Sequence, residues 1–205
     1  MNKDVCCENP LSLADWERQW ADFAPGFDGT HAHIILENGS TLLLKPGPGF
    51  GDASHPTTRL MLRFLAKIVP YKRVLDVGCG SGILSLASCL LGAKYVHGID
   101  IEEDAIAHSL ENAKLNSLVE KVDFSLPQTP CLEKNVVLMN MISSEQKQAW
   151  QSLSLPSLLI EKVLVSGILQ EERESYLRYV QSEWGFCLQE EWEEEGWLAF
   201  LFSVS

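Results

Sequence analysis

Positively charged residues are scarce in this sequence compared with acidic ones. Its 205 residues include 16 Lys and Arg against 28 Asp and Glu, which gives a formal net charge of −12 and a pI near 4.8. Tight, sequence-independent binding to phosphate backbones requires clustered Lys and Arg, so we expect no direct binding to nucleic acid. A cationic partner is easier to accommodate with this charge.

Long apolar runs and metal-type cysteine spacing are also missing. The first ten residues contain no apolar stretch of the length that a signal peptide or a membrane span requires, so we expect neither targeting nor membrane association. His31 and His33 alternate on one strand face, but no carboxylate or thiol pattern accompanies them, and we predict no metal site. Reduced thiols in a cytoplasm suit the six cysteines, which lack Cys-x-x-Cys spacing and lie at positions 6, 7, 79, 89, 131 and 187.

The hydrophobic content is sufficient for one substantial core. With 46% hydrophobic and 21% charged residues, the chain has the composition of a globular domain. Residues 1–48 are expected to form an extension with an amphipathic helix over Leu11–Ala21, anchored by Leu13, Trp16 and Trp20. Two strands of this extension, at 31–36 and 41–44, flank the hairpin turn Asn38-Gly39.

From residue 49 to residue 205, short apolar runs alternate with stretches of helical spacing. This alternation predicts an α/β domain with a mostly parallel, doubly wound sheet. The last two strands are separated by too few residues for a helical crossover, so they should pair antiparallel, with the acidic run Glu190–Glu195 at a solvated hairpin tip. Helices are expected at 57–69, 83–91, 103–115, 145–153 and 170–182, and strands at 74–77, 95–101, 122–125, 136–140, 162–165, 186–191 and 197–204.

A glycine-rich turn joins one predicted strand to the helix that follows it. Asp76-Val77 ends the strand, residues 78–82 (Gly-Cys-Gly-Ser-Gly) form the turn, and Ile83 opens the helix. Glycines let a ligand approach the backbone, and the helix N-terminus is expected to offer unpaired N–H groups to an anionic or electron-rich ligand group. Ile83 stands where the dinucleotide fingerprint has its third glycine, which argues against a nicotinamide cofactor.

Asp100 ends the next predicted strand, twenty-two residues after Gly78. Its carboxylate can accept hydrogen bonds from both ribose hydroxyls of a nucleoside. The alternative is that the glycines only allow close packing of strand and helix, and that Asp100 caps the next helix. The combination of Asp76, the turn and Asp100 favours a nucleoside site contacted by Gly78, Gly80 and Asp100.

The turn is similar to motif one of the seven-stranded, Rossmann-like class I methyltransferases, and a second block narrows this resemblance. Residues 49–58, Gly-Phe-Gly-Asp-Ala-Ser-His-Pro-Thr-Thr, resemble the Phe-Gly-Thr-Gly-Thr-His-Pro-Thr-Thr signature of the PrmA family, which methylates ribosomal protein L11. Asp52 and Ala53 depart from that signature, where the family has Thr and Gly. The likeness covers nearly the whole chain, with further similar blocks at residues 15–18, 98–101, 111–116 and 166–169.

The resemblance implies that S-adenosylmethionine is the cofactor. By their positions in the family's motifs, Thr58, Gly78, Gly80, Asp100 and Asn140 are expected to contact it, with Asn140 at the start of the block that matches the family's Asn-Ile-Leu motif. The resemblance also implies N-methylation of lysine or N-terminal amino groups of a ribosomal protein.

Asn140 is in addition the expected catalytic residue. An amine with a pKa of about 10.4 must lose its proton before it can accept a methyl group, which costs roughly 4.6 kcal/mol at pH 7. We hypothesise that Asn140 orients the amine through a carbonyl oxygen; a simple turn-forming asparagine is the alternative. His55 suits either a general base or a structural hydrogen bond, and Thr58 suits either a ligand contact or helix capping.

The methyl acceptor is less well determined than the methyl donor. Bacterial members of the family carry an N-terminal substrate-recruiting domain, whereas only fourteen residues precede Asp15 here, so the resemblance is to the catalytic domain. The first hypothesis is methylation of a ribosomal protein. The alternatives are methylation of another protein lysine or a small amine, and a non-catalytic cofactor-binding module; the presence of Asp100 and Asn140 favours an enzyme.

Overall fold

A seven-stranded sheet forms the centre of the computed structural model, which describes residues 13–127, 135–153 and 159–204. The strand order is β5-β4-β3-β6-β7-β9-β8; pairing is parallel from β5 to β7, and β9 runs antiparallel to both β7 and β8. The predicted sheet with its antiparallel C-terminal hairpin is thereby confirmed. Its strands are β3 (Arg73–Val77), β4 (Tyr95–Ile99), β5 (Val122–Ser125), β6 (Asn135–Asn140), β7 (Ile160–Leu169), β8 (Phe186–Glu194) and β9 (Trp197–Val204).

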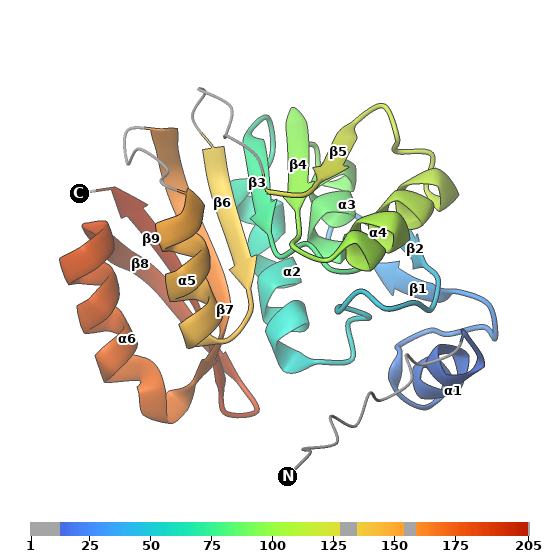
Figure 1. The fold of residues 1–205 in the computed structure, drawn as a ribbon, viewed down its shortest axis with the longest axis horizontal. Coiled ribbons are helices and arrows are strands. Elements are labelled where there is room, and N and C mark those ends of the chain that lie inside the picture. The colour runs from blue at the N-terminus through green and yellow to red at the C-terminus, as the bar shows by residue number, and fades with distance from the viewer. Residues whose placement is uncertain (1–12, 128–134, 154–158, 205) are drawn as a thin grey trace, which may run out of the picture.

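Helices cover both faces of this sheet (Figure 1). Side chains of α2, α3 and α4 join one hydrophobic cluster, and side chains of α5 and α6 join a second cluster on the opposite face. Within the described ranges, no helix is long and apolar enough to cross a membrane. The helices are α1 (Leu13–Phe23), α2 (Pro56–Ile68), α3 (Ile83–Leu90), α4 (Glu103–Leu115), α5 (Ser143–Leu153) and α6 (Arg173–Tyr179).

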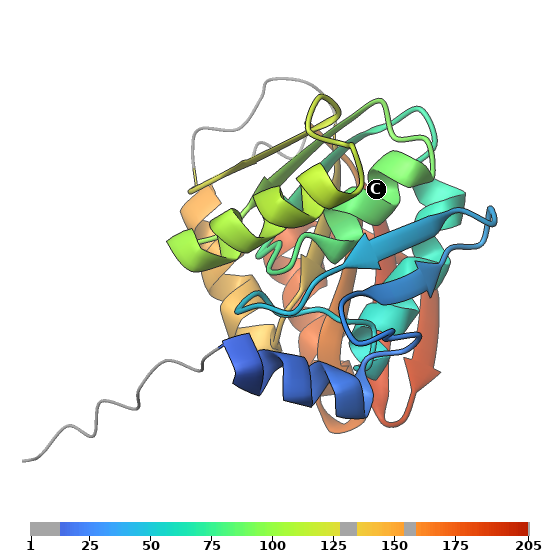
Figure 2. The ribbon, with the colours of Figure 1, turned by 90° about the vertical axis from the view of Figure 1, so that its right-hand side faces the viewer.

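The N-terminal helix and a β-hairpin lie at one side of the sheet (Figure 2). Strands β1 (Ala32–Ile35) and β2 (Thr41–Leu44) pair antiparallel, which confirms the predicted hairpin. Of the aromatic anchors of α1, Trp20 is buried and Trp16 half-buried; the side chain of Leu13 and the predicted helix start at residue 11 lie outside the described residues, as do Cys6, Cys7 and Cys131. The division of the chain at residue 48 stays a prediction.

Polar side chains of α4 and of its C-cap residue Asn116 hold the hairpin and the chain that follows it. Asn116 Nδ2 donates to Leu43 O at 2.6 Å, and its Oδ1 accepts from Leu43 N at 2.9 Å. One turn earlier, Asn112 Oδ1 accepts from Lys45 N at 3.0 Å, and its Nδ2 donates to Ser81 O at 2.9 Å. Because residues four apart share one face of a helix, Asn112 and Asn116 bind the backbone of residues 43–45 and of the glycine turn from the same side.

The helix after the glycine turn is capped by the protein itself. Asp76 on β3 is 1% exposed, and its carboxylate accepts hydrogen bonds from the hydroxyl of Ser85, at 2.6 Å, and from the backbone N–H of Ser85. The N–H of Ile83 donates to Ser81 Oγ at 3.4 Å. The expectation that the start of α3 offers unpaired N–H groups to a ligand is wrong at these two positions, because a buried carboxylate and a hydroxyl already accept from them.

Most elements differ from their predicted bounds by one to three residues, as β4 does by ending at Ile99 and β8 by ending at Glu194, and two elements differ more. β7 continues four residues past 165, to Leu169, because a bulge between Ser166 and Ile168 lets the strand bend and keep its pairing with β9. The predicted helix at 170–182 is composite: a 3₁₀ turn at Gln170–Glu172, then α6, then a π-helical turn at Val180–Trp184.

Two carboxylates of the acidic run Glu190–Glu195 form ion pairs with arginines of two helices. Glu194 contacts Arg59 of α2 at 2.5 Å, and Glu191 contacts Arg173 of α6 at 2.6 Å. The side chains of Glu194 and Glu191 are only 17% and 26% exposed. The expected solvated tip is therefore wrong for these two carboxylates, because the sequence alone does not reveal that basic helix faces lie opposite them.

Replacing Asn112 by alanine tests the role of α4 in holding the glycine turn. Asn112→Ala leaves Lys45 N and Ser81 O without their partners, and we expect the free energy of unfolding to fall by about 2 to 4 kcal/mol in urea titrations. Lys114→Ala, at an exposed position of the same helix, is the control and should change stability by less than about 0.5 kcal/mol. Equal stability of the two variants would contradict the assignment.

The buried carboxyl of Asp76 predicts a pH-dependent stability. Burial, more than the nearby charge of Asp100, raises the pKa of Asp76 from 3.8 to about 6. The hydrogen bonds from Ser85 lower this pKa and only partly offset the effect of burial. Between these values the folded state retains a proton that the unfolded state has lost, so this group destabilises the fold as the pH rises. Relative to wild type, Asp76→Asn should gain up to about 3 kcal/mol of unfolding free energy between pH 4 and pH 7. The control Asp22→Asn, at an exposed position of α1, should show no such gain. If the unfolding free energy of Asp76→Asn differed from that of wild type by the same amount at every pH, the prediction would be refuted.

Candidate functional site

A cavity of about 1050 Å³ opens at the carboxyl ends of the parallel strands. It spans the point between β3 and β6 where the strand order reverses, which is the usual ligand position in open α/β sheets. Four of the predicted site residues line it: Gly78 and Gly80 after β3, Asp100 after β4, and Asn140 at the end of β6. Thr58, the fifth, is fully buried and is not among the lining residues.

The glycine turn and the chain segment 49–55 are joined by backbone contacts. Ser81 N donates to Phe50 O at 2.8 Å, and Ser81 Oγ donates to Gly51 O at 2.5 Å. A Cβ atom on Gly80 would lie 2.5 Å from Phe50 O, and one on Gly49 would collide with the backbone of Gly80. Side chains at these two glycines would separate the loops, so the two sequence motifs form one structural unit.

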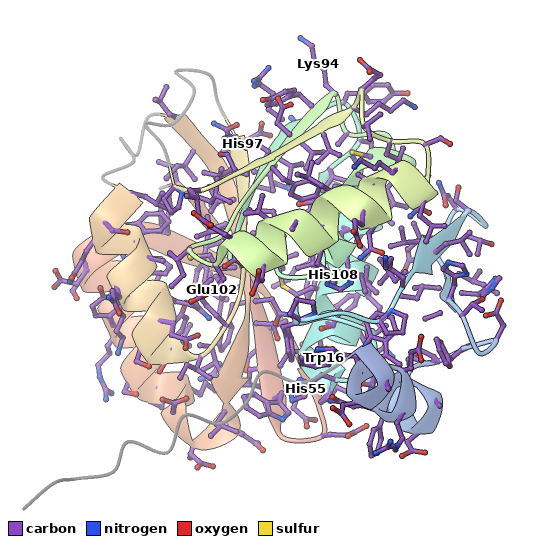
Figure 3. The ribbon with its side chains drawn as sticks, turned by 45° about the vertical axis from the view of Figure 1, so that its right-hand side comes forward. Trp16, His55, Lys94, His97, Glu102 and His108 are labelled. Atoms are coloured by element: carbon purple, nitrogen blue, oxygen red, sulfur yellow. The ribbon has the colours of Figure 1, made fainter. Side chains whose placement is uncertain are left out.

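His108 of α4 fixes the beginning of the same segment (Figure 3). Its Nδ1 accepts from Gly49 N at 3.1 Å, and its Nε2 donates to Lys45 O at 2.8 Å. This pattern requires a neutral ring, in agreement with burial that lowers the pKa of His108. The sequence motifs did not indicate this residue; the only signal in the sequence was its position four residues before Asn112 and eight residues before Asn116.

Asp100 is held at the cavity by two backbone N–H groups. Its Oδ2 accepts from Gly80 N at 2.9 Å, and its Oδ1 accepts from Glu102 N at 3.1 Å, where α4 begins. A carboxylate oxygen has two acceptor sites, so each oxygen can still receive a hydrogen bond from a ligand. The residue that caps α4 is Glu102, so the capping alternative for Asp100 is wrong, and the two hydrogen bonds of its carboxylate are compatible with the ligand-binding hypothesis.

Asn140, which lines the cavity, forms a hydrogen bond with Thr58 behind it. Asn140 Nδ2 donates to Thr58 Oγ1 at 3.1 Å. Asn140 Oδ1 is buried and has no hydrogen-bond partner among the described residues. Buried acceptors are normally satisfied, so an unsatisfied one on a cavity-lining residue marks a position for a ligand donor. Thr58 is placed to orient Asn140.

Three aromatic rings line another part of the cavity. The ring centroid of His55 lies 5.8 Å from that of Phe50 and 5.1 Å from that of Trp197. His55 caps α2, with its Nδ1 accepting from Thr57 N at 3.4 Å, so the structural hydrogen bond expected for this histidine is present. Burial, followed by the charge of Arg59, lowers the pKa of His55. Figure 3 labels His55 at the start of α2.

The charged groups that line the cavity are all acidic among the described residues: Asp100, Glu102, Asp104 and Glu145. A cavity with carboxylates and no Lys or Arg favours cationic ligands. No group of three His, Cys, Asp or Glu in the described ranges could hold a metal ion.

Comparison with known proteins relates this geometry to one family. Residues 8–204 match the family model described as "Ribosomal protein L11 methyltransferase (PrmA)". A curated protein of that name from Hahella chejuensis is 36% identical over 182 residues, which are 84% of this chain and 62% of the relative. The chain thus spans about three fifths of the length of the curated relatives it matches.

One solved structure supports the same relationship, and a second one shares the fold. The crystal structure of a ribosomal protein L11 methylase from Lactobacillus delbrueckii subsp. bulgaricus matches with a TM-score of 0.71 and 25% identity, over 84% of this chain and 89% of that one. Sp1610 of Streptococcus pneumoniae, solved in complex with S-adenosyl-L-methionine, shares the fold with a TM-score of 0.58 and 15% identity, over 72% of each chain. The family match covers the signature segment, the glycine turn, Asp100 and Asn140 alike, and this chain belongs to the ribosomal protein L11 methyltransferase (PrmA) family.

Proposed function

We propose that this chain transfers methyl groups from S-adenosylmethionine to amino groups of a ribosomal protein. One observation carries the proposal: a single cavity is lined by Asp100, whose carboxylate lies beside the glycine turn, and by Asn140, whose buried Oδ1 has no partner among the described residues. The first group suits a nucleoside, and the second suits an N–H donor. The names of the curated relatives, which are ribosomal protein L11 methyltransferases, support the choice of acceptor.

The cavity suits S-adenosylmethionine in shape and charge. Asp100 would accept hydrogen bonds from the ribose hydroxyls, and Gly78 and Gly80 line the same cavity. The sulfonium and the amino group of this cofactor are cationic, as the acidic lining favours. When bound, S-adenosylmethionine supplies an electrophilic methyl group.

The remaining part of the cavity suits an amine acceptor. Ile142 and Trp197 line it with apolar surface, which disfavours an ammonium ion and lowers the pKa of an amine. Asn140 Oδ1 accepts an N–H of the neutral amine and so orients its lone pair, while Thr58 keeps the amide in that orientation. His55 Nδ1 is engaged by Thr57 N–H and is not placed to act as the base through this nitrogen.

A cationic protein is the acceptor that the charge of the chain favours. The net charge of −12 repels phosphate backbones and attracts basic segments such as those of ribosomal proteins. The proposed activity would take place in the cytoplasm, where ribosomal proteins are made.

Incubation with methyl-labelled S-adenosylmethionine tests the acceptor. Free L11, intact ribosomes and total protein extract are offered in parallel, and label on L11 supports the proposal. Label on another protein or on small amines would show that the acceptor is one of the alternatives and not L11. Cofactor binding without transfer in any arm would indicate a non-catalytic module, and failure to bind S-adenosylmethionine below about millimolar concentration would overturn the proposal.

Removal of the Asp100 carboxylate should weaken cofactor binding. Asp100→Ala is expected to raise the Kd for S-adenosylmethionine by about 10- to 100-fold in calorimetric titration, because charge-assisted hydrogen bonds contribute about 1.5 to 3 kcal/mol. Asp123→Ala, at an exposed position of β5 outside the cavity lining, is the matched control. Unchanged affinity in Asp100→Ala would remove this residue from the site.

Removal of the Asn140 amide should act mainly on turnover. Asn140→Ala is expected to lower kcat with L11 about 100-fold, because the amine loses the group that orients it. Asn140 also lines the cofactor cavity, so a weakening of S-adenosylmethionine binding by about threefold is expected. Asn38→Ala, in the exposed turn of the N-terminal hairpin, serves as the control. Unchanged affinity together with unchanged kcat in Asn140→Ala would show that both roles are wrongly assigned.

A further inference from the structure

We infer that Gln146 is a positioning residue for methyl transfer, because its amide fixes the segment of residues 140–142 that links the glycine turn to the acceptor part of the cavity. The kinetic consequence rests on the proposed function. The structural consequence, a fixed conformation of this segment, can be tested without turnover.

Gln146 lies on α5 and is fully buried. Its Nε2 donates to Met141 O at 2.7 Å and to Ser166 O at 3.0 Å, and its Oε1 accepts from the hydroxyl of Tyr176 on α6. A flipped amide would bring its oxygen against two carbonyl oxygens, so the surroundings allow one orientation only. The amide therefore ties the end of β6 to the bulge in β7 and to α6.

The bulge in β7 completes this connection. Gly167 follows Ser166 with a φ of 97°, and a Cβ atom there would collide with Met141 O. Ser166 Oγ donates to Leu198 O at 2.9 Å, which anchors the bulge to β9. The backbone that follows β6 thus lies close to the backbone of β7 at the cavity wall. Gln146 donates a hydrogen bond to one carbonyl group of each segment.

The fixed segment touches both parts of the proposed site. Met141 Cε lies so close to Gly78 that a Cβ atom on this glycine would collide with it, so Met141 covers the cofactor turn. Asn140, the preceding residue, carries the unpartnered Oδ1. Thr58 holds the side chain of Asn140, and Gln146 holds the backbone that follows it. A shift of this backbone changes the cover of the turn and the direction of Asn140 together.

A purely packing role would not require an amide. Burying a polar side chain is costly unless its hydrogen bonds are made, and here each polar atom of the amide has a partner. The two carbonyl groups that it binds belong to residues on either side of the cavity wall. Gln146 thereby determines the direction of the backbone at the place where the methyl acceptor is proposed to bind.

Gln146→Glu tests this role with little change in side-chain volume. An ionised carboxylate cannot donate to Met141 O or Ser166 O, and we expect kcat with L11 to fall about 10- to 100-fold at pH 9, since a small misplacement of a reacting group has effects of this size. Gln151→Glu, at an exposed position of the same helix, introduces the same charge outside the cavity. It is the matched control and should retain wild-type kcat.

The pH dependence of the loss separates the missing hydrogen-bond donor from an effect of side-chain shape, which does not change with pH. Burial raises the pKa of the introduced carboxyl, and its protonated form regains one donor, so the deficit relative to wild type should shrink by about fivefold or more between pH 9 and pH 6.5. Burial also raises the pKa of Tyr176, which stays neutral in this range. The nearby charged groups are Glu145 on α5 and Glu172, which accepts from Ser143 Oγ at 2.7 Å; both are present in wild type and variant alike. A deficit that is constant with pH would count against the inference.

A double-mutant comparison tests whether Gln146 acts through Asn140. In the Asn140→Ala background, Gln146→Glu should lower kcat by no more than about twofold further, because the group being positioned is already absent. Equal losses in both backgrounds would overturn the inference.

Two measurements keep the inference separate from the proposed function. Hydrogen exchange of the backbone amides in residues 139–146 should accelerate in Gln146→Glu and not in Gln151→Glu, and the Kd for S-adenosylmethionine should rise about threefold or more because Met141 covers the turn. If wild type transfers no methyl group, the proposed function fails, and these readouts still decide the structural part. If wild type is active and Gln146→Glu matches it in exchange, affinity and kcat, the inference alone fails.

Discussion

The hydrogen bonds from Ser81 to Phe50 and Gly51 are the contacts on which the rest of the site depends. They join two segments that are separate in sequence, and they can form only because Gly49 and Gly80 lack side chains where the two backbones meet. The joined loops bring an aromatic ring and a carboxylate to one cavity. The ring belongs to Phe50 of the first loop, and the carboxylate belongs to Asp100, which accepts a hydrogen bond from Gly80 of the second loop. α4 stabilises both loops from behind, through His108 and Asn112.

Buried polar groups are arranged in the same way at the other half of the cavity. Thr58 and Gln146 use their hydrogen bonds to hold the side chain of Asn140 and the backbone after it. Each supporting group is fully buried, so its hydrogen bonds do not compete with water, and loss of one partner is costly. In this half, Asn140 Oδ1 has no hydrogen-bond partner among the described residues, and the proposed chemistry needs an acceptor at that position.

Much of the fold was predictable because its determinants are local. Periodic apolar residues located the helices and strands, and the short connection before Trp197 required antiparallel pairing. The errors arose where the deciding contact is distant in sequence. The bulge that lengthens β7 depends on the packing of Gly167 against Met141, and the ion pair of Glu194 depends on Arg59, 135 residues away. The cap that Asp76 provides to α3 through Ser85 was likewise not predicted.

The sequence by itself determined the class of fold, the family and four residues that line the cavity at the strand ends, because glycines and carboxylates at fixed offsets from strand ends are typical of nucleoside sites in doubly wound sheets. Only the tertiary structure decided which side chains face the cavity. It buried Thr58 behind Asn140, placed His55 in an aromatic wall with Trp197, and placed Gln146 against two strand ends. These outcomes depend on burial and on hydrogen bonds between elements that are far apart in the chain, and a sequence pattern carries no direct record of either.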